Sequence, residues 1–275
     1  MTGQTDAAIQ ARGLVAGYGG PPVCRGVDLD IARGGFTVIV GPNGCGKSTL
    51  LRSLCRLLVP EAGQVLLNGR DIAQVPAREL ARQVGLLPQS AEAPPGITVT
   101  DLAARGRYPH QGFFRQWSDA DSVAVARAMA ATGITALADR QVDQLSGGQR
   151  QRVWVAMALA QQTPILCLDE PTTYLDIAHQ VDLLELLTGL HAGGRTLVAV
   201  LHDLNQACRY ATDLVVMSAG RVIAQGAPAQ VMTPELMAGV FDLDCLVIPD
   251  PVTATPMVVP KGRRAGREAM ASIAY

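Results

Sequence analysis

The sequence lacks an uninterrupted apolar run of the roughly 18 residues that a membrane-spanning helix requires, although 48% of its 275 residues are hydrophobic. Its longer apolar segments, such as residues 196–201, have the length of a buried strand. Residues Met1–Ala8 also lack the basic start and apolar centre of a signal peptide. We therefore expect a cytosolic chain that buries a substantial core, as one large domain or two small ones.

Charge and cysteine content argue against nucleic acid and against a zinc centre. The formal net charge is −1, so the chain has no overall basic field. Its six cysteines form no CxxC pair and have no histidine at zinc spacing, so we expect reduced thiols. Cys55 and Cys167 fall in apolar segments typical of a core, whereas Cys45 lies in a glycine-rich loop, where it could be oxidised.

One motif dominates the sequence: the pattern GxxxxGK[ST], between an expected strand over 36–40 and an expected helix over 47–58. Its glycines let backbone N–H groups converge where the positive end of the helix dipole points, which predicts a phosphate site. Lys47 can reach the outer phosphates, and the Ser48 hydroxyl can ligate Mg²⁺. The expected nucleotide contacts of this loop are Gly41, Pro42, Asn43, Gly44, Cys45, Gly46, Lys47, Ser48 and Thr49.

Strands are expected over 9–15 and 23–31, and the second alternates with the period of a half-buried sheet. The glycine- and proline-rich turn between them carries Tyr18, which could stack on a base, although such a ring more often packs on the surface.

After the motif we expect a strand over 63–72 with a turn at Asn68-Gly69, a helix over 77–83 and a strand over 84–88. Gln89 follows that last strand. Because ligands of open α/β sheets gather beyond the carboxyl ends of strands, Gln89 is positioned to sense what the phosphate loop holds.

Residues 90–143 lose strand character and indicate an inserted helical subdomain. Ser118 begins a capping box, and the helix that follows is expected to end at Thr132, with Gly133 as its stop. Residues 105–114 mix aromatic rings with positive charge on an expected loop. Such a segment is either a partner surface or an ordinary solvated loop.

A second anion site is expected at the LSGGQ segment over 145–149, which opens a helix over 150–161. The aliphatic strand after it ends in two carboxylates. We expect Asp169 to hold Mg²⁺ through water, and Glu170 to face the other way, as strand neighbours do, and to act as general base. His202 follows the next strand, although a lone histidine is more often structural.

The remaining chain predicts a helix over 204–210, a hairpin over 214–224, two helices near Pro228 and Pro234, and a short strand over 246–248. A proline-spaced segment and a basic tail over 261–267 follow, and we expect that tail to be frayed and solvated.

These motifs, in this order, resemble the nucleotide-binding subunit of ABC transporters over essentially the whole chain. The phosphate loop alone is shared with kinases and many GTPases, whereas LSGGQ one helix before a strand ending in Asp-Glu is highly specific. The resemblance implies an α/β fold, a P-loop NTPase cassette with a RecA-like core, an N-terminal antiparallel β subdomain and an inserted α-helical subdomain. It divides the chain into a cassette over 8–245, with the insertion at about 90–150, and a C-terminal extension over 246–275.

The same resemblance implies ATP and Mg²⁺ as cofactors. It makes Tyr18 the adenine-stacking aromatic, Gln89 the Q-loop glutamine, Asp176 the D-loop aspartate and His202 the switch histidine at the γ-phosphate. The implied catalytic residues are Glu170, His202 and Gln89, and the implied metal ligands are Ser48, Gln89 and Asp169. The implied contacts to nucleotide outside the phosphate loop are Tyr18, Ser146, Gly147, Gly148, Gln149 and Asp176.

Four further segments, over 105–110, 171–180, 201–207 and 250–260, look like those of the ATPases of ferric-siderophore importers. The implied function is ATP hydrolysis that energises uptake of a ferric siderophore. Haem and cobalamin importers share part of these segments and are alternatives, as is another importer or exporter with the same cassette. A soluble ABC ATPase of DNA repair or translation is a further alternative, but the chain shows no long heptad insertion and no second cassette.

The resemblance also implies partners. Two copies are expected to stack head to tail, so that Ser146 of one closes over the phosphate loop of the other. Integral membrane permease subunits are expected to contact residues 89–114, and an extracytoplasmic binding protein would act indirectly. No nucleic acid is expected. The implied location is peripheral, on the cytoplasmic side of the inner or plasma membrane.

Overall fold

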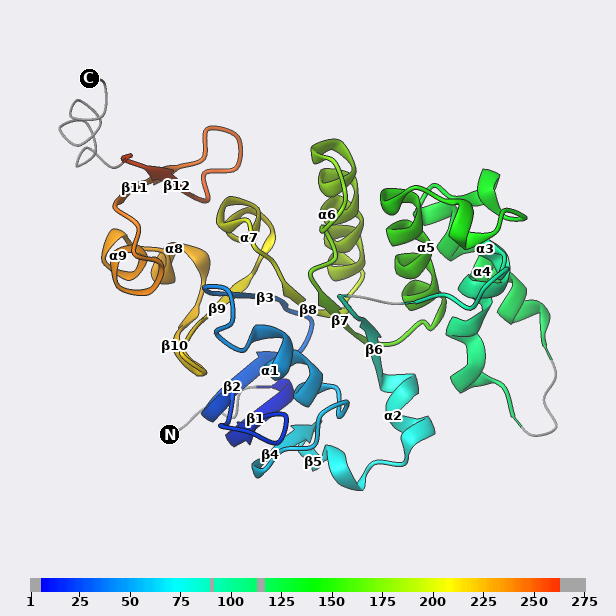
Figure 1. The fold of residues 1–275 in the computed structure, drawn as a ribbon, viewed down its shortest axis with the longest axis horizontal. Helices are drawn as coiled ribbons and strands as arrows, with labels where there is room; N and C mark the ends of the chain where they lie inside the picture. The colour runs from blue at the N-terminus through cyan, green and yellow to red at the C-terminus, as the bar shows by residue number, and fades with distance from the viewer. Residues whose placement is uncertain (1–5, 90–91, 113–116, 263–275) are drawn as a thin grey trace, which may run out of the picture.

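The computed structural model of the chain describes residues 6–89, 92–112 and 117–262 (Figure 1). Within these residues the strands form a four-stranded sheet in the order β2-β1-β4-β5, a six-stranded sheet in the order β10-β9-β3-β8-β7-β6, and a two-stranded sheet of β11 and β12. In Figure 1 the helices α3 (Val99–Ala104) and α4 (Asp119–Ala131) lie at one end of the molecule, and the two-stranded sheet lies at the other. No helix among the described residues is long and apolar enough to cross a membrane.

The four-stranded sheet is antiparallel, as the family resemblance implied, and the alternating burial of β2 agrees with the half-buried sheet predicted from residues 23–31. Asn68 and Gly69 both have positive φ values, of 52° and 78°, and they form the predicted tight turn, which joins the fourth and fifth strands along the chain. The strands of this sheet are β1 (Ala7–Ala16), β2 (Cys24–Ala32), β4 (Ala62–Leu67) and β5 (Arg70–Asp71).

The six-stranded sheet carries five parallel strands and one antiparallel edge strand, β10. Because the five strands are parallel, their carboxyl ends lie at one edge, where the residues that follow them can meet. The strands are β3 (Phe36–Val40), β6 (Val84–Leu87), β7 (Ile165–Asp169), β8 (Thr196–Val200), β9 (Asp213–Ser218) and β10 (Arg221–Gly226).

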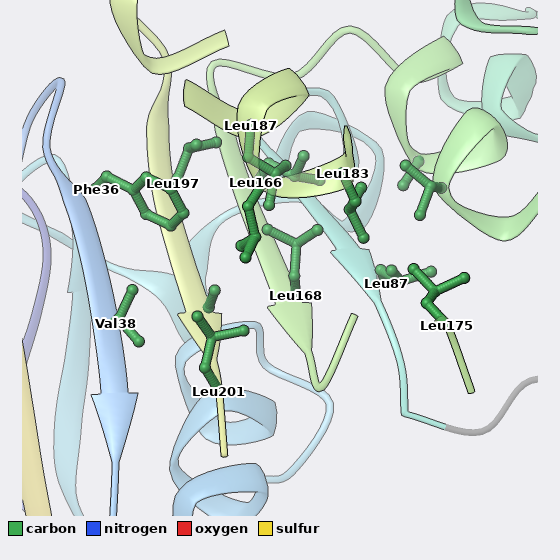
Figure 2. Packing of buried hydrophobic residues seen from close by; sticks show 14 of the residues in the cluster. Phe36, Val38, Leu87, Leu166, Leu168, Leu175, Leu183, Leu187, Leu197 and Leu201 are labelled. Carbon is green, nitrogen blue, oxygen red and sulfur yellow. The ribbon is translucent and has the colours of Figure 1, made fainter. Parts of the chain in front are cut away.

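Each face of this sheet packs into its own apolar core. Leu166 and Leu168 of β7 face one core together with Leu183 and Leu187 of α6 (Ile177–Ala192), as Figure 2 shows. Cys167, the strand residue between them, faces the other core, which the antiparallel sheet and α1 complete. The near-continuous hydrophobic sequence of these strands follows from burial on both faces.

The helix α1 (Lys47–Leu54) is four residues shorter than the predicted helix over 47–58. Arg56 has a φ of 58°, and the N–H of Leu57 donates to the carbonyl of Arg52. A left-handed residue with that bond is a Schellman ending. The sequence contains no glycine at this point, so nothing in it marked the stop.

The helices before and after β6 correspond closely to expectation. The helix α2 (Ala77–Gln83) has the predicted bounds, and α4 begins with the predicted capping box of Ser118 and Asp121. The helix α5 (Gly147–Ala160) begins three residues earlier than predicted, because Ser146 and Gln149 form a second capping box. The short 3₁₀ segments are η1 (Ile72–Gln74), η2 (Arg105–His110), η3 (Thr135–Leu137) and η4 (Val142–Gln144).

The prediction that residues 105–114 form a loop of exposed rings and charges was wrong in part. Residues 105–110 form η2, and Arg107 is buried, with its Nε 2.8 Å from Asp121 Oδ1 and its Nη1 2.7 Å from the carbonyl of Ala160. Tyr108 is exposed as expected. Phe113 and Phe114 lie outside the described residues.

The C-terminal part follows prediction up to its final strands. Its helices are α7 (Leu204–Tyr210), α8 (Pro228–Val231) and α9 (Pro234–Phe241). The strand predicted over 246–248 is β11 (Cys245–Pro249), and the proline-spaced segment supplies an unpredicted partner, β12 (Pro256–Pro260).

The hairpin of β11 and β12 is bound to α7 by polar contacts. The Asn205 side chain donates to the carbonyl of Val258 at 3.3 Å and accepts from its N–H at 2.7 Å, and Arg209 pairs with Asp250 at 2.7 Å. Lys261, the first residue of the predicted basic tail, lies 3.0 Å from Asp244, and the tail beyond Gly262 lies outside the described residues.

Candidate functional site

A cavity of about 490 Å³ lies at the carboxyl edge of the central sheet. It is bounded by the loop after β3, the start of α1 and the residues that follow β6, β7 and β8. This is the edge at which open α/β sheets bind ligands. Its lining consists of Val23, Asn43, Gly44, Gly46, Lys47, Ser48, Thr49, Gln89, Glu170 and His202.

The predicted phosphate loop forms one wall of this cavity. Gly44 and Gly46 have φ values of 75° and 106°, which only glycine adopts readily, and no side chain in the described part of the chain caps the N-terminus of α1 after Gly46. Lys47 Nζ donates to the carbonyls of Gly41 and Pro42 at 2.9 and 3.1 Å. An N-terminus without a side-chain cap and the ammonium group of Lys47 therefore lie at the cavity, a combination suited to phosphate.

Ser48 and Asp169 meet at the floor of the site. The Ser48 hydroxyl donates to Asp169 Oδ1 at 2.7 Å, and Asp169 Oδ2 is buried without a hydrogen-bond partner among the described residues. Burial raises the pKa of Asp169, while the bond from Ser48 and the charge of Arg52 act in the opposite direction. A hydroxyl beside a carboxylate with a spare oxygen is a donor set that fits a hard cation such as Mg²⁺.

Glu170 faces the cavity for a different reason from the one predicted. The strand β7 ends at Asp169, and Glu170 has a φ of 53°, so strand alternation does not set its direction. The left-handed residue turns the chain, and the Glu170 carboxylate comes to lie between two side chains from neighbouring strands. Its Oε1 lies 2.7 Å from His202 Nε2, and its Oε2 accepts from Gln89 Nε2 at 2.8 Å.

The three predicted catalytic residues are thus brought together in one chain. Gln89, which was also predicted as a metal ligand, uses its amide nitrogen on Glu170. Thr173 Oγ1 lies 3.4 Å from the same carboxylate, a contact that sequence reasoning missed. Val23 and Arg52 were also missed, although the spacing of Arg52 four residues after Ser48 would have put it on the same face of α1.

The predicted contacts of the LSGGQ segment do not line this cavity. Ser146 accepts from the N–H of Gln149, and the Gln149 side chain accepts from the N–H of Ser146, each at 3.2 Å. Gly147 instead lines a separate cavity of about 290 Å³, together with Gln89, Trp154 and Tyr174. One chain therefore keeps the phosphate loop and the LSGGQ helix apart.

Tyr18 and Asp176 also lie outside the lining of the phosphate cavity. Tyr18 is 60% exposed, and its hydroxyl accepts from Arg52 at 3.3 Å. Asp176 caps α6 by accepting from the N–H of His179 at 2.9 Å, and this bond together with the His179 ring lowers its pKa. Both side chains reach solvent and are available to a second molecule.

Cys45 occupies the phosphate loop but is not an exposed thiol. It is buried, and burial raises its pKa, which disfavours the reactive thiolate. All six cysteines lie in the described residues and are buried without a disulfide, in agreement with the expected reduced thiols. The expectation that Cys45 is open to oxidation therefore finds no support in its surroundings.

Comparison with known proteins gives consistent matches. A profile of the family described as "ABC transporter" matches residues 24–173. The ferric enterobactin transport ATP-binding protein FepC of Escherichia coli K12 is 55% identical over 95% of this chain and 97% of its own length. A probable siderophore transport ATP-binding protein of Bacillus subtilis, YusV, is 51% identical over 94% of each. Proteins named for cobalamin and hemin import are more distant, at 41% identity.

Solved structures agree in fold. An inward-facing, putative metal-chelate ABC transporter has a chain that superposes with a TM-score of 0.78 at 27% identity, over 93% of this chain and 97% of its own. A dimeric bacterial ABC transporter cassette superposes with a TM-score of 0.72 at 28% identity, over 80% of this chain and 98% of its own. The predicted fold class is confirmed by these likenesses and by the sheets described above.

Proposed function

This chain belongs to the ABC transporter family, whose ATP-binding subunits hydrolyse ATP to drive transport, and from that premise we propose that it energises uptake of a ferric siderophore. The observation that carries the proposal is its 55% identity, over nearly its whole length, to a ferric enterobactin transport protein. Relatives named for cobalamin or hemin import are less similar, which favours iron chelates over those cargoes. An ATPase subunit does not touch the cargo, so the cargo rests on this similarity alone.

The chemistry of the proposal follows from the residues around the phosphate cavity. The N–H groups of the loop and Lys47 bind the phosphates of ATP. Glu170 orients and deprotonates the attacking water as general base. His202 contacts the γ-phosphate, and Gln89 senses it. The direct contact of both residues with the Glu170 carboxylate supports this assignment.

Mg²⁺ completes the proposed site. Ser48 and Asp169 would hold it, because their hydroxyl and unpaired carboxylate oxygen suit a hard cation. Held there by Ser48 and Asp169, Mg²⁺ would supply positive charge that offsets the charge of the phosphates of ATP. Gln89 remains a proposed third ligand.

A second copy of the chain completes the proposed site from outside. Ser146, Gly147, Gly148 and Gln149 begin a helix away from the phosphate cavity of their own chain, which supports their use on the ATP of a partner. The likeness to a dimeric cassette supports self-association. ATP would then hold two chains together, and charge repulsion between the products of hydrolysis would loosen them. Tyr18 against adenine and Asp176 at the dimer contact complete the proposed contacts.

The remaining partners and the location follow from the transport function. Integral membrane permease subunits bind the ATPase, and an extracytoplasmic binding protein delivers the chelate to them. The chain would therefore be peripheral, on the cytoplasmic side of the membrane. We also retain the division into a cassette over 8–245, with its helical insertion at about 90–150, and an extension over 246–275.

The test combines purification with uptake. The tagged chain should bring an integral membrane partner with it, and a deletion strain should lose growth on ferric siderophores but keep growth on hemin as the iron source. Retention of nucleic acid without any membrane partner would instead favour a soluble ABC ATPase. If the deletion strain instead lost only growth on hemin, the chain would be assigned to a haem importer. If it lost only cobalamin uptake, the chain would be assigned to a cobalamin importer.

A further inference from the structure

Two arginine side chains of α2 converge on a single backbone carbonyl. Arg78 Nε and Arg82 Nε donate to the carbonyl oxygen of Pro109 in η2, at 3.0 and 2.8 Å. Both side chains are exposed. They lie one helical turn apart, where like charges repel each other. Two guanidinium groups are therefore held side by side against one neutral acceptor.

No carboxylate within the described residues compensates this pair of charges. Neither arginine forms an ion pair there, and each donates through its Nε alone. Glu79, which lies between them in sequence, is 3.7 Å from Arg70 instead. The Nη groups of both arginines are thus left to bind an acceptor from outside, and a carboxylate is the acceptor that two guanidinium forks suit best.

An exposed ring belongs to the same 3₁₀ segment as the Pro109 carbonyl. Tyr108, the residue before Pro109, is 60% exposed, whereas Arg107 of the same segment is turned inward onto Asp121. Tyrosine and arginine are the residue types most enriched at the energetic centres of protein interfaces. We call Arg78, Arg82 and Tyr108 the arginine–tyrosine patch.

The patch joins α2 and η2. The helix α2 leads to Gln89, and η2 leads through α5 to Ser146. The helix α2 runs directly into β6, as Figure 1 shows, and Gln89 follows that strand. The segment η2 contacts the C-terminal end of α5, because His110 Nε2 lies 2.8 Å from the carbonyl of Gln161, the residue just after that helix. At its other end α5 is capped by Ser146, so a partner seated on the patch contacts both connections at once.

We propose that the arginine–tyrosine patch receives an acidic side chain from a cytoplasmic segment of the permease, with Tyr108 packing beside it. The inference rests on the proposed transport function and specifies the chemistry of the contact. A carboxylate bridging Arg78 and Arg82 replaces their mutual repulsion with two charge-assisted contacts. The partner segment is accordingly acidic where it meets α2 and apolar or aromatic where it meets Tyr108.

The experiment compares two variants of equal charge change in the full chain, co-expressed with its permease. Arg78→Glu/Arg82→Glu should reduce co-purification of the permease by about tenfold or more, as expected when an attractive charge contact across an interface becomes repulsive. Arg127→Glu/Arg221→Glu, which changes exposed arginines on α4 and β10, should leave it unchanged. ATP hydrolysis by the isolated subunit should be the same in both, because neither pair lines the phosphate cavity.

Two further measurements separate the contact from folding and identify its partner. Arg78→Gln/Arg82→Gln keeps donors for the Pro109 carbonyl but removes the charge, so it should retain the melting temperature and still weaken binding. In the Glu/Glu variant, replacing single acidic residues of the permease loops with arginine should restore binding at one position.

The outcomes distinguish the inference from the function on which it rests. If the wild-type chain brings no permease with it, the proposed function fails. If wild type and the Glu/Glu variant bring equal amounts, the inference alone is overturned. The inference is also overturned if wild type binds protein-free phosphatidylglycerol vesicles, the Glu/Glu variant does not, and no permease substitution restores binding, because the patch would then recognise lipid.

Discussion

Glu170 and His202 contact each other directly, with His202 Nε2 2.7 Å from Glu170 Oε1. The contact exists because β7 and β8 are paired in parallel, with Asp169 opposite Val200, so that the residues beyond both strands emerge together. The proposed general base is thus held on one side by a residue of the next strand and on the other by Gln89.

Glu170→Gln should slow ATP turnover by about 10²- to 10⁴-fold, the range of a lost general base, while ATP binding is retained. The amide keeps the size of the side chain but cannot take a proton. Steady-state phosphate release and binding of a fluorescent ATP analogue measure the two effects. Glu235→Gln, on the exposed side of α9, is the control and should hydrolyse ATP at the normal rate. Undiminished turnover by Glu170→Gln would remove Glu170 from its role.

Ser146→Arg should leave ATP binding to the phosphate loop intact but prevent ATP-dependent pairing of two chains. The long cation would occupy the space in which the partner's γ-phosphate must meet the start of α5. Size-exclusion chromatography with ATP, in the Glu170→Gln background, measures the dimer. Ser146→Thr retains the capping hydroxyl and should dimerise normally. A normal ATP-bound dimer of Ser146→Arg would contradict the shared site.

Asp121→Asn should lower the free energy of unfolding by about 2 kcal/mol at pH 7, since one pKa unit is worth about 1.4 kcal/mol. Bonds from the Ser118 side chain and the contact with Arg107 lower the pKa of Asp121 from 3.8 to about 2. The stability that this shift provides is present above pH 4 and is lost as the pH falls toward 2.

Urea unfolding at pH values from 7 down to 3 tests this dependence. The difference between wild type and Asp121→Asn should shrink as the pH falls below 4. Asp119→Asn changes an exposed carboxylate at the start of the same helix and should cost only a few tenths of a kcal/mol. A gap between wild type and Asp121→Asn that stays constant with pH would show that the ion pair is not the cause.

Gly106→Ala should destabilise the junction of η2 and α5, because an added Cβ would lie 2.1 Å from the carbonyl of Met157. We expect a cost of about 1–3 kcal/mol, as for other overpacked sites. Gly189→Ala is a matched control inside α6, where a Cβ meets no atom within 4 Å, and it should stabilise by up to about 1 kcal/mol. Melting temperatures of the two variants should therefore move in opposite directions.

Asn205→Leu should release the hairpin of β11 and β12 from α7. The Asn205 amide makes both a donor and an acceptor contact with Val258, and leucine makes neither, so backbone groups of a buried residue lose their partners. Hydrogen exchange of residues 245–260 should accelerate, while that of β3 should not change. Asn205→Asp keeps the acceptor and should have a smaller effect. Equal protection in Asn205→Leu would assign the attachment to Arg209 and Asp250.

Much of the fold could be predicted from the sequence because its signals are local. The bounds of α2 and α7, the Asn68-Gly69 turn and the Ser118 cap follow from turn residues, caps and hydrophobic period. The wrong predictions concern features that these sequence signals do not mark. The early end of α1 uses a left-handed Arg56, and β12 forms between prolines because a partner strand is available. The residues around Arg56 and around β12 carry no sequence signal that predicts either feature.

The candidate site also combines features that the sequence predicts with features that it does not. The phosphate loop and the strand-end positions of Gln89, Glu170 and His202 could be found from motif and topology. The orientation of Glu170 could not, because a positive φ in a non-glycine residue replaced the strand geometry that the argument assumed. The inward turn of Arg107 was also hidden, since only the folded chain brings Asp121 and the end of α5 to it.

The parallel sheet that gathers these side chains also has a far border, and that border offers room for protein engineering. The tight turn at Gly193 and Gly194, just before β8, is exposed, and it is separated from His202 by the full length of the strand. A fluorescent peptide spliced between those two glycines would report on the state of the molecule while leaving its chemistry untouched. Even one extra residue within β8 would shift and reverse every side chain after it, and uncouple His202 from Glu170.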